Sequence, residues 1–428
     1  MPESDAHRFR DDPLLHVVLR LPEFWRIREV KVSERPPEEL AKDMRLTRPR
    51  GQVDVYLEAV GDRLPCPVCR AASPRHSERA ERVWEGLPIC DYRLLVHARP
   101  PRVNCPEHGV HTVVTPWAPA KSGFTYELEF RMLDLAKEMP ILKVAEALGV
   151  GRHRVERVVH RWVSFYRRQL RMDHVTAIAI DEKAVHKGQR YVTVVTDQDT
   201  HQVLFATSGR SAEVLEEFAR ELMAHGGDPA RIAYITMDMN AAYAKGAERS
   251  FPNAQIVYDK YHLVAHMQKA VDEVRREEQR TAPGLKKTRW LWLKNPQDLT
   301  RAQEERLAEV TRRYRKTPRA YGLRLELQDV LDAGPPGAEA ALRKWFFRAT
   351  HSHLEPVIGV AYMIKRHWDG VVRAINTGLT NAVAEGRNSV IQLAKQRARG
   401  FRFVQTFINM IFLINSPVDR SLLTLVGQ

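Results

Sequence analysis

The pattern of apolar and polar positions changes several times along the chain, and each change predicts a different kind of structure. Apolar residues recur every three or four positions over residues 125–172, which predicts helices. Short β-type runs fill residues 175–259, with a helical segment at 212–223 between them. The pattern is helical again over 261–370, and a last helix is predicted over 379–398, before the apolar run FVQTFINMIFLI. The pattern therefore predicts a multidomain α+β protein.

The first 118 residues follow a less regular pattern. LLHVVLRL, residues 14–21, is compatible with a strand, and the rest of residues 1–60 carries no recognisable chemistry. Residues 61–118 hold all four cysteines within proline-rich, β-type sequence. No apolar run reaches about 18 residues, so we expect no membrane-spanning helix. The N-terminus lacks the apolar core of a signal peptide, and we expect a cytoplasmic protein with reduced thiols.

The charge of the chain is strongly positive. It has 67 Lys and Arg residues against 53 Asp and Glu residues, which gives a formal net charge of +14. The hydrophobic content of 44% is ordinary for a globular protein. An excess of this size favours a polyanion such as nucleic acid as the partner, although a solvated basic surface gives the same excess.

Two short motifs have the spacing of metal ligands. CPVC at residues 66–69 and CPEH at residues 105–108 can each place two donors on one side of a tight turn, at tetrahedral angles to a shared ion. With the β-type sequence between them they describe a zinc ribbon, so we predict a closed, structural Zn²⁺ site. His111 competes for the fourth position, and Cys90 is expected to be a buried core residue of the intervening strand. The predicted ligands are Cys66, Cys69, Cys105 and His108.

A helix-turn-helix motif is predicted within residues 119–172. Residues 141–148 form an apolar helical face, Gly149-Val150-Gly151 forms a turn, and a second helix with one apolar and one basic face follows. In this motif the second helix enters the major groove, where arginines contact phosphates and guanine edges. An ordinary helical hairpin with a solvated basic face is the alternative. The predicted DNA contacts are Arg152, Arg154, Arg157 and Arg161.

Three apolar runs end on an aspartate. The runs at residues 177–180 and 232–237 and the segment AQIVY at 254–258 are each followed directly by an aspartate, namely Asp181, Asp238 and Asp259. The C-terminal ends of parallel strands gather at one edge of a sheet, so these carboxylates are expected to converge. Several carboxylates together need a cation, and oxygen ligands favour Mg²⁺ or Mn²⁺. Glu182 is a rival for Asp181, but alternation along a strand turns it to the opposite side.

A polar stripe on the last predicted helix offers a further acid. At helical spacing Glu385, Asn388, Lys395 and Arg399 fall along one side, so the stripe begins with a carboxylate and ends with cations. Such a stripe suits a metal ion bound beside a phosphate backbone. Gly386 costs up to about 1 kcal/mol in a helix interior, which indicates a packing or site reason. Two ions held by such acids can activate a water or a 3′-hydroxyl for displacement at phosphorus.

Together these stretches resemble the bacterial DDE-type insertion-sequence transposases, and more narrowly the ISL-three family. The similar stretches are CPVC…CPEH, IAIDEKAVHKGQRYVTVVTD, ITMDMNAAYAKGAERSFPNAQIVYDKYHLV and TNAVAEGRNSVIQLAKQRARGFRFVQTF. The family more usually has a second cysteine pair where this chain has CPEH. The resemblance implies a zinc ribbon, a helix-turn-helix and a ribonuclease-H-like α/β catalytic domain interrupted by an all-helical insertion. The expected boundaries are 1–60 for an N-terminal extension, 61–118 for the zinc ribbon, 119–172 for the helix-turn-helix, 173–265 and 372–428 for the catalytic domain, and 266–371 for the insertion.

The resemblance also implies roles for the acids. Asp181, Asp238 and Glu385 would be the three catalytic acids, with Mg²⁺ or Mn²⁺ as the cofactor. Asp259-x-x-His262 resembles an element found in several transposase groups with such insertions. The residues expected to support the site or to contact DNA near it are Asp259, His262, Asn388, Lys395, Arg397 and Arg399.

The expected protein is a DNA transposase that associates with the bacterial nucleoid. It would bind the terminal inverted repeats of its element, cut double-stranded DNA there and join the 3′ ends to target DNA, as a homodimer or a larger assembly. Two alternatives remain open: a DNA-binding regulator with an inactive catalytic domain, and a ribonuclease-H-like nuclease without strand transfer. Cut products exclude the regulator, and joined products exclude the nuclease.

Overall fold

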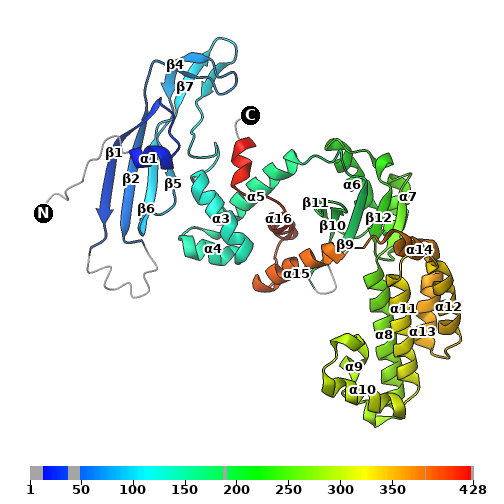
Figure 1. Cartoon of the computed structure of the whole chain (residues 1–428). Coiled ribbons are helices and arrows are strands. Elements are labelled where there is room, and N and C mark those ends of the chain that lie inside the picture. Colours follow the sequence, from blue (N-terminus) through cyan, green and yellow to red (C-terminus); the bar gives the residue numbers. More distant parts are fainter. Residues whose placement is uncertain (1–12, 37–48, 187–189, 381, 426–428) are drawn as a thin grey trace. The chain divides into compact units, whose positions relative to one another are not determined.

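The computed structural model describes residues 13–36, 49–186, 190–380 and 382–425 and divides into two compact units (Figure 1). The first unit is Met1–Trp162 together with Pro417–Gln428, and the second is Val163–Ser416. The last residues of the chain therefore group with the first unit, whereas the sequence pattern placed them with the catalytic domain. Among the described residues, no helix combines the length and the apolar character needed to cross a bilayer.

One sheet of the first unit joins strands that the sequence pattern had separated. Its order is β1-β2-β6-β5, with β2 parallel to β6 and the other neighbours antiparallel. The sheet therefore crosses the boundary expected at residue 60, because β2 pairs with a strand from the cysteine-containing region. The strands are β1 (Trp25–Glu34), β2 (Gly51–Ala59), β5 (Arg82–Glu85) and β6 (Tyr92–Ala98).

Buried tryptophans form the core beneath this sheet. The ring of Trp117 lies edge-on to Trp25 at 4.8 Å and to Trp84 at 5.5 Å. Aromatic rings favour such edge-to-face contacts over face-to-face stacking. Trp25 and Trp84 come from strands more than fifty positions apart, so this core depends on the long-range pairing of the sheet.

A short helix, α1 (Pro13–Val18), lies where the sequence pattern suggested a strand. The strand expected over residues 14–21 is wrong. Leu15 and Leu19 are buried, whereas Val17 and Val18 between them are exposed. Buried positions four residues apart belong to one side of a helix, while a strand would have buried every second residue.

A second small sheet of the first unit has the order β3-β4-β7-β8, with antiparallel neighbours. Two tight turns, one from β3 to β4 and one from β7 to β8, contain the two cysteine motifs. Both turns have a left-handed residue four positions after the first cysteine, Arg70 with φ 61° and Gly109 with φ 73°. The strands are β3 (Arg63–Pro65), β4 (Ala72–Glu78), β7 (Pro101–Cys105) and β8 (Gly109–Thr112).

Three helices follow, α3 (Tyr126–Glu138), α4 (Ile141–Leu148) and α5 (Arg152–Gln169). Thr125 caps α3 by accepting a hydrogen bond from the backbone N–H of Leu128. Gly149 ends α4 in the left-handed region, at φ 65°, which glycine adopts without a steric penalty. The chain can therefore turn sharply into α5, as the spacing of glycines predicted.

The second unit is built on a sheet with the order β11-β10-β9-β12-β13. β10 is antiparallel to both of its neighbours, β9 and β11, and β12 and β13 run parallel to β9. Between these strands lie α6 (Glu213–Ala224) and α7 (Ala241–Ser250). The strands are β9 (Ala177–His186), β10 (Arg190–Asp197), β11 (Val203–Ser208), β12 (Tyr234–Met237) and β13 (Gln255–Tyr258).

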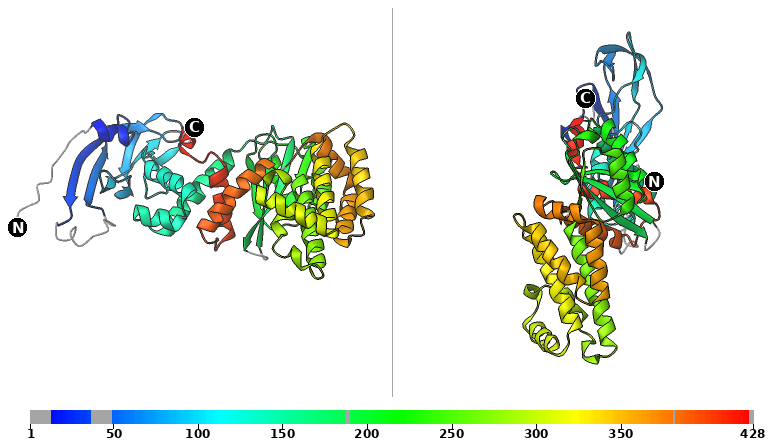
Figure 2. Two further views of the ribbon diagram at one scale, coloured as in Figure 1. Left: turned by 60° about the horizontal axis from the view of Figure 1, so that its bottom comes forward. Right: turned by 90° about the vertical axis from the view of Figure 1, so that its right-hand side faces the viewer.

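A run of helices separates β13 from the end of this unit, as predicted. Figure 2 shows the longer helices of this run packed side by side, and α8 contacts both α11 and α13. Trp292 and Trp345 are fully buried among them, while Trp290 is 64% exposed. The helices are α8 (Lys260–Gln279), α9 (Arg289–Leu293), α10 (Arg301–Arg313), α11 (Lys316–Asp332), α12 (Ala338–Thr350), α13 (Glu355–Arg366) and α14 (Trp368–Thr377).

The last helices bring the chain back to the sheet. α15 (Ala382–Arg397) contacts α16 (Val404–Asn415), and α16 packs on the edge strand β11. α14 packs on the opposite edge strand, β13, where a Cβ at Gly370 would lie 2.5 Å from the ring of Tyr258. The remaining elements are short 3₁₀ helices at Pro229–Arg231, Pro283–Leu285, Pro296–Asp298 and Arg420–Leu425.

Candidate functional site

The strand register brings the three predicted aspartates to one edge of the sheet. In the parallel pairing of β9 with β12, Thr236 lies opposite Ala179. Asp238 and Asp181 each come two residues later, so they are at the same level. Met237 of β12 lies opposite Tyr258 of β13, so Asp238 is also level with Asp259. Residues at the same level of neighbouring parallel strands lie about 5 Å apart along the sheet. The register thus puts the three aspartates at one level of the sheet, although Asp181 lies inside β9 and not at a strand end as its apolar run had indicated.

His262 lies between two of these aspartates. It is in the first turn of α8, with Nδ1 3.8 Å from Oδ2 of Asp238 and Nε2 3.9 Å from Oδ2 of Asp259. The side chain of Asp259 is 1% exposed and caps α8 by accepting from the backbone N–H of Tyr261. The side chain of Asp238 is 47% exposed. A buried aspartate, a histidine and an accessible aspartate thus form a continuous polar group.

Asp181 has close partners on its own strand. Its Oδ2 accepts a hydrogen bond from Nζ of Lys183 at 2.6 Å, and its Oδ1 accepts from the backbone N–H of Glu182 at 2.6 Å. The apolar pattern gave no indication that Lys183 belongs to this site, because a lysine two positions after an acid is common on exposed strands. Here the lysine side chain is 8% exposed.

Glu182 takes part in a different set of contacts. Its Oε1 accepts a hydrogen bond from Nδ2 of Asn240 at 2.9 Å. It also lies near Tyr243, whose pKa is raised mainly by burial, with a further contribution from Glu182. The hydroxyl of Tyr243 is hydrogen-bonded to Thr193 at 2.7 Å. Alternation along β9 therefore separates the contacts of Glu182 from those of Asp181.

A second histidine lies near the aspartates without having been predicted. His367 precedes α14, and its ring packs against Tyr258 at 4.8 Å. Burial lowers the pKa of His367, Arg366 lowers it further, and the charge of Asp238 acts in the opposite direction. The sequence around His367 carries no motif, so only the packing of α14 on β13 reveals this proximity.

The last predicted acid lies on α15. The side chains of Glu385 and Asn388 belong to the segment 382–388, which lies outside the described side chains. Both ends of this helix are nevertheless tied to the sheet. Gln198 donates to the carbonyl of Thr380 at 2.8 Å, and Lys395 donates to the carbonyl of Ala184 in β9. Of the basic residues predicted at its end, Arg397 and Arg399 are exposed.

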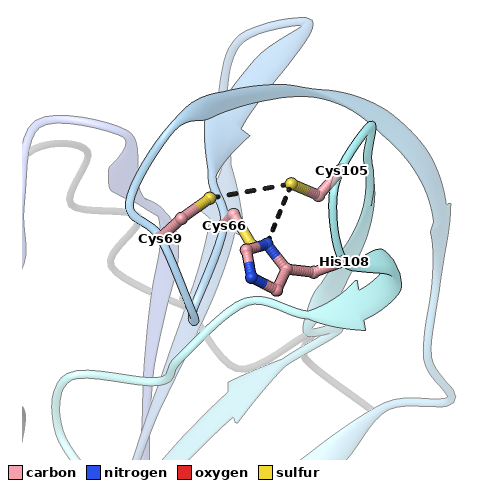
Figure 3. Close-up of side chains that lie close together, drawn as sticks. All are labelled: Cys66, Cys69, Cys105 and His108. Carbon is pink, nitrogen blue, oxygen red and sulfur yellow. Dashed lines mark hydrogen bonds between the residues drawn. The ribbon is translucent and has the colours of Figure 1, made fainter.

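The four predicted zinc ligands lie together in the first unit (Figure 3). Their donor atoms are all within 4.8 Å of one another. Sγ of Cys105 lies 3.7 Å from Sγ of Cys69 and 3.6 Å from Nδ1 of His108. The hydrogen bond with His108 is the largest cause of a lowered pKa of the Cys105 thiol, about 6, which favours the thiolate form that binds metals. The four residues that could hold a metal ion here are Cys66, Cys69, Cys105 and His108.

The two residues left open by the sequence have other positions. A ring nitrogen of His111 is hydrogen-bonded to the backbone carbonyl of His108 at 2.8 Å, so His111 lies against the turn and not in the cluster. The expectation that Cys90 is buried is wrong, because Cys90 is exposed. It lies in the turn before β6 with φ 46°, outside any strand, because the chain reverses there between Ile89 and Tyr92.

The helix-turn-helix has the predicted apolar faces. Val144 of α4 and Val155, Val158 and Trp162 of α5 are buried. Along the other face of α5 the arginines differ in their contacts. Arg157 is exposed. Arg152 is paired with Glu156 of the same helix at 2.9 Å, Arg154 lies over the ring of Phe124 and 3.4 Å from Glu85, and Arg161 is paired with buried Glu129.

Comparison with protein families decides what kind of protein carries these sites. A family model described as "Transposase", the DDE model of ISL3, matches residues 178–411, which is more than half of the 428-residue chain. A second model, the helix-turn-helix domain of transposase family ISL3, matches residues 113–163. The chain belongs to the ISL3 family of DDE transposases. Both matches coincide with the sites described above: the first contains the aspartates, and the second contains α3 and α4 and most of α5.

Curated proteins related to this transposase have similar lengths. The transposase for insertion sequence element IS1001 from Bordetella parapertussis is 29% identical over 369 residues, which cover 84% of this chain and 90% of that protein. The transposase for insertion sequence element IS1557 from Mycobacterium tuberculosis is 29% identical over 361 residues, which cover 78% of this chain and 81% of that protein. The likeness therefore extends over both units of this transposase.

Glu129 of α3 holds α5 of the transposase in place. It is fully buried on α3 and accepts hydrogen bonds from the indole N–H of Trp162 at 2.7 Å, from Arg161 and from the hydroxyl of Ser122. Two of these donors are buried. Loss of a buried carboxylate leaves its buried hydrogen-bond donors without an acceptor, which costs free energy of folding. Glu129 therefore ties α5 to the rest of the unit.

Glu129→Ala is therefore expected to destabilise the first unit by roughly 3 kcal/mol, because its donors lose their acceptor. Urea unfolding of the full-length protein measures this difference. Glu138→Ala, an exposed glutamate at the end of the same helix, is the matched control and should change stability by about 0.5 kcal/mol or less. Equal effects of the two substitutions would contradict the role given to Glu129.

Proposed function

We propose that this transposase binds the terminal inverted repeats of an insertion sequence, cuts the DNA at these ends and joins the resulting 3′-hydroxyl ends to target DNA. The observation that carries the proposal is the register of the sheet, in which Asp181, inside β9, is level with Asp238 and Asp259, which directly follow β12 and β13. A phosphodiester enzyme of this kind needs several carboxylates at one place. Family membership supports the reaction class, since the relatives are transposases for insertion sequence elements.

The topology of the second unit supports a ribonuclease-H-like catalytic domain. Its sheet begins with an antiparallel meander and continues with parallel strands on the other side of β9, in the order β11-β10-β9-β12-β13. In this order Asp181 lies on the central strand, β9, and Asp238 directly follows the neighbouring parallel strand, β12. We propose that residues 173–265 and the helices after 372 form this domain, and that residues 266–371 are inserted into it.

The donor set fits a divalent metal ion. Aspartate oxygens are the hard ligands that Mg²⁺ and Mn²⁺ prefer, and adjacent carboxylates repel one another unless a cation lies between them. We propose that Asp181, Asp238 and Glu385 hold these ions. When bound, the ions would lower the pKa of a water or 3′-hydroxyl and stabilise the leaving oxygen. His262 would hold Asp238 and Asp259 in place through its two ring nitrogens.

The anchors of α15 support the part proposed for Glu385. The carbonyl of Ala177 accepts from the backbone N–H of Gln198, whose side chain donates to Thr380, so this end of α15 lies near the start of β9. Lys395 reaches Ala184, seven residues along β9. The thirteen residue steps from Ala382 to Lys395 of α15 span about 20 Å, and seven strand residues span about 23 Å, so the helix follows the strand for most of its length. A helix that follows β9 in this way reaches the level of Asp181 near Asn388, about one turn after Glu385.

The first unit would supply recognition of the element ends. We propose that α5 lies in the major groove and that the zinc site holds the small β3-β4-β7-β8 sheet in shape. Arg157 is exposed on α5 and is available to phosphates, and Arg152 is exposed although it is paired with Glu156 of the same helix. Arg154 and Arg161 are less exposed and contact Glu85 and Glu129. Two ends must be cut and joined together, so we propose a dimer or a larger assembly on DNA.

The experiment that tests the reaction uses full-length protein and duplexes that carry the inverted repeats flanking its gene. Incubation with Mg²⁺ should yield strands cut at the repeat ends and, with a target plasmid, joined products. Binding without cutting in Mg²⁺ and in Mn²⁺ would favour the regulator and contradict the proposal. Cutting without joined products would favour a nuclease.

Arg157→Ala is expected to weaken binding to the inverted repeats by roughly tenfold and to reduce the salt dependence by about one phosphate contact. The reason is that Arg157 is exposed on the basic face of α5. Fluorescence anisotropy at several salt concentrations measures both quantities. Arg131→Ala removes an exposed arginine from α3 of the same unit and serves as the control. Loss of the same size in both variants would argue against α5 as the recognition helix.

A further inference from the structure

A buried lysine, Lys183, donates a hydrogen bond to Asp181, the first of the proposed catalytic acids. Lys183 and Asp181 are two residues apart on β9 and therefore project from the same side of the strand. Nζ of Lys183 is 2.6 Å from Oδ2 of Asp181, and the lysine side chain is 8% exposed. A lysine charge is expensive to bury unless an acid compensates it, so this contact is part of how the edge of the sheet is stabilised.

The Lys183 ammonium group contacts a carboxylate oxygen of Asp181 that a bound metal ion would also use. Oδ1 of Asp181 accepts from the backbone N–H of Glu182, which fixes the plane of the carboxylate, and Oδ2 is the oxygen that faces Lys183. A divalent ion bound to that carboxylate would take one of the same oxygens at about 2.1 Å. The ammonium group and the ion would then be only a few ångströms apart with charges of the same sign, and would repel each other.

We infer that Lys183 is a resident counter-cation of the catalytic site, which neutralises Asp181 when no divalent ion is bound and competes with that ion for the carboxylate. The inference rests on the proposed function, in which Asp181 is a metal ligand. Lys183 then sets the concentration of divalent ion at which the transposase becomes active. It also keeps neighbouring carboxylates from repelling one another in the metal-free protein.

Lys183→Met removes the charge and keeps an unbranched apolar side chain that can fill the same buried space. We expect this variant to bind Mn²⁺ roughly tenfold more tightly than the unsubstituted protein, because a repulsion between cations is removed. Binding is measured on the zinc-loaded full-length protein by the loss of the electron paramagnetic resonance signal of free Mn²⁺. The Mg²⁺ concentration that gives half-maximal DNA cleavage should fall by a similar factor.

Two further substitutions at the same position separate charge from packing. Lys183→Arg keeps the charge and should leave the Mn²⁺ affinity close to that of the unsubstituted protein. Lys183→Gln removes the charge but keeps a donor for Asp181, and should tighten binding as Lys183→Met does. Thermal unfolding shows whether Lys183→Met is folded. If it is not, Lys183→Gln tests the inference in its place.

The outcomes distinguish this inference from the proposed function. If the unsubstituted protein binds Mn²⁺, Asp238→Ala loses this binding, and the uncharged variants bind no more tightly, Lys183 is a structural partner only and the inference is overturned while the metal site stands. If neither the unsubstituted protein nor the uncharged variants bind Mn²⁺, both the inference and the proposed metal site are overturned. Tighter binding in both uncharged variants, with no change in Lys183→Arg, supports the inference.

Discussion

Asp238→Ala is expected to reduce metal-dependent cutting of the element ends by roughly a thousandfold or more while leaving DNA binding unchanged. Asp238 lies level with both Asp181 and Asp259, so its removal takes away the central carboxylate of the group. A group that stabilises charge only during the reaction contributes to the rate and not to the binding of the substrate. The helix proposed to bind DNA, α5, begins in the other unit and should be unaffected.

Single-turnover cleavage of labelled duplex measures the first quantity, and anisotropy with the same duplex measures the second. Asp199→Ala is the matched control, since Asp199 is an exposed aspartate near the opposite edge of the same sheet, where β10 ends. It should cut DNA at the unsubstituted rate. Retained cutting in Asp238→Ala would remove the basis of the proposed mechanism, and loss of binding together with cutting would indicate a folding defect.

Removal of the zinc ligand Cys105 is expected to have the second largest effect. Cys105→Ala should lose bound Zn²⁺, lower the thermal stability of the first unit and abolish specific binding to the inverted repeats. The strands that carry the cluster have 3 to 7 residues each, and a sheet this small has little core of its own. In such small sheets the free energy of zinc binding, on the order of 10 kcal/mol, is largely folding free energy.

Metal analysis of purified protein, thermal unfolding and DNA binding measure these three effects. Cys90→Ser is the matched control, because Cys90 is an exposed cysteine of the same unit outside the cluster, and it should retain Zn²⁺ and stability. His108→Ala should lose Zn²⁺ and His111→Ala should keep it, as the positions of the two rings imply. A Cys105→Ala protein that keeps its metal and its binding would refute the structural zinc site.

Local patterns were sufficient for the parts of the site whose geometry depends on neighbouring residues. An apolar run that ends on an aspartate placed Asp238 and Asp259 directly after a strand, and the three runs do pair side by side, although β9 continues past Asp181 to His186. The two cysteine turns and the glycine turn before α5 are likewise short segments, in which spacing alone limits the backbone to a few conformations. The family resemblance then related these segments to one another.

Other features depend on which distant segment becomes the neighbour. Arg161 carries the same charge as Arg157, but only the packing of α3 beneath α5 pairs Arg161 with buried Glu129. In the same way β2 belongs with β6 across the boundary expected at residue 60, and Cys90 is exposed because the chain reverses there. A window of sequence holds no information on such partners.

The sequence by itself determined the family of this protein, most of the secondary structure along it and the four residues of the cysteine and histidine cluster. Only the tertiary structure decided that His262 lies between Asp238 and Asp259, that Lys183 is buried against Asp181, and that some arginines of α5 are used within the protein. The physical reason is that periodicity and turn chemistry act over a few residues. The surroundings of a charge, by contrast, are set by burial and by contacts between segments far apart in the chain.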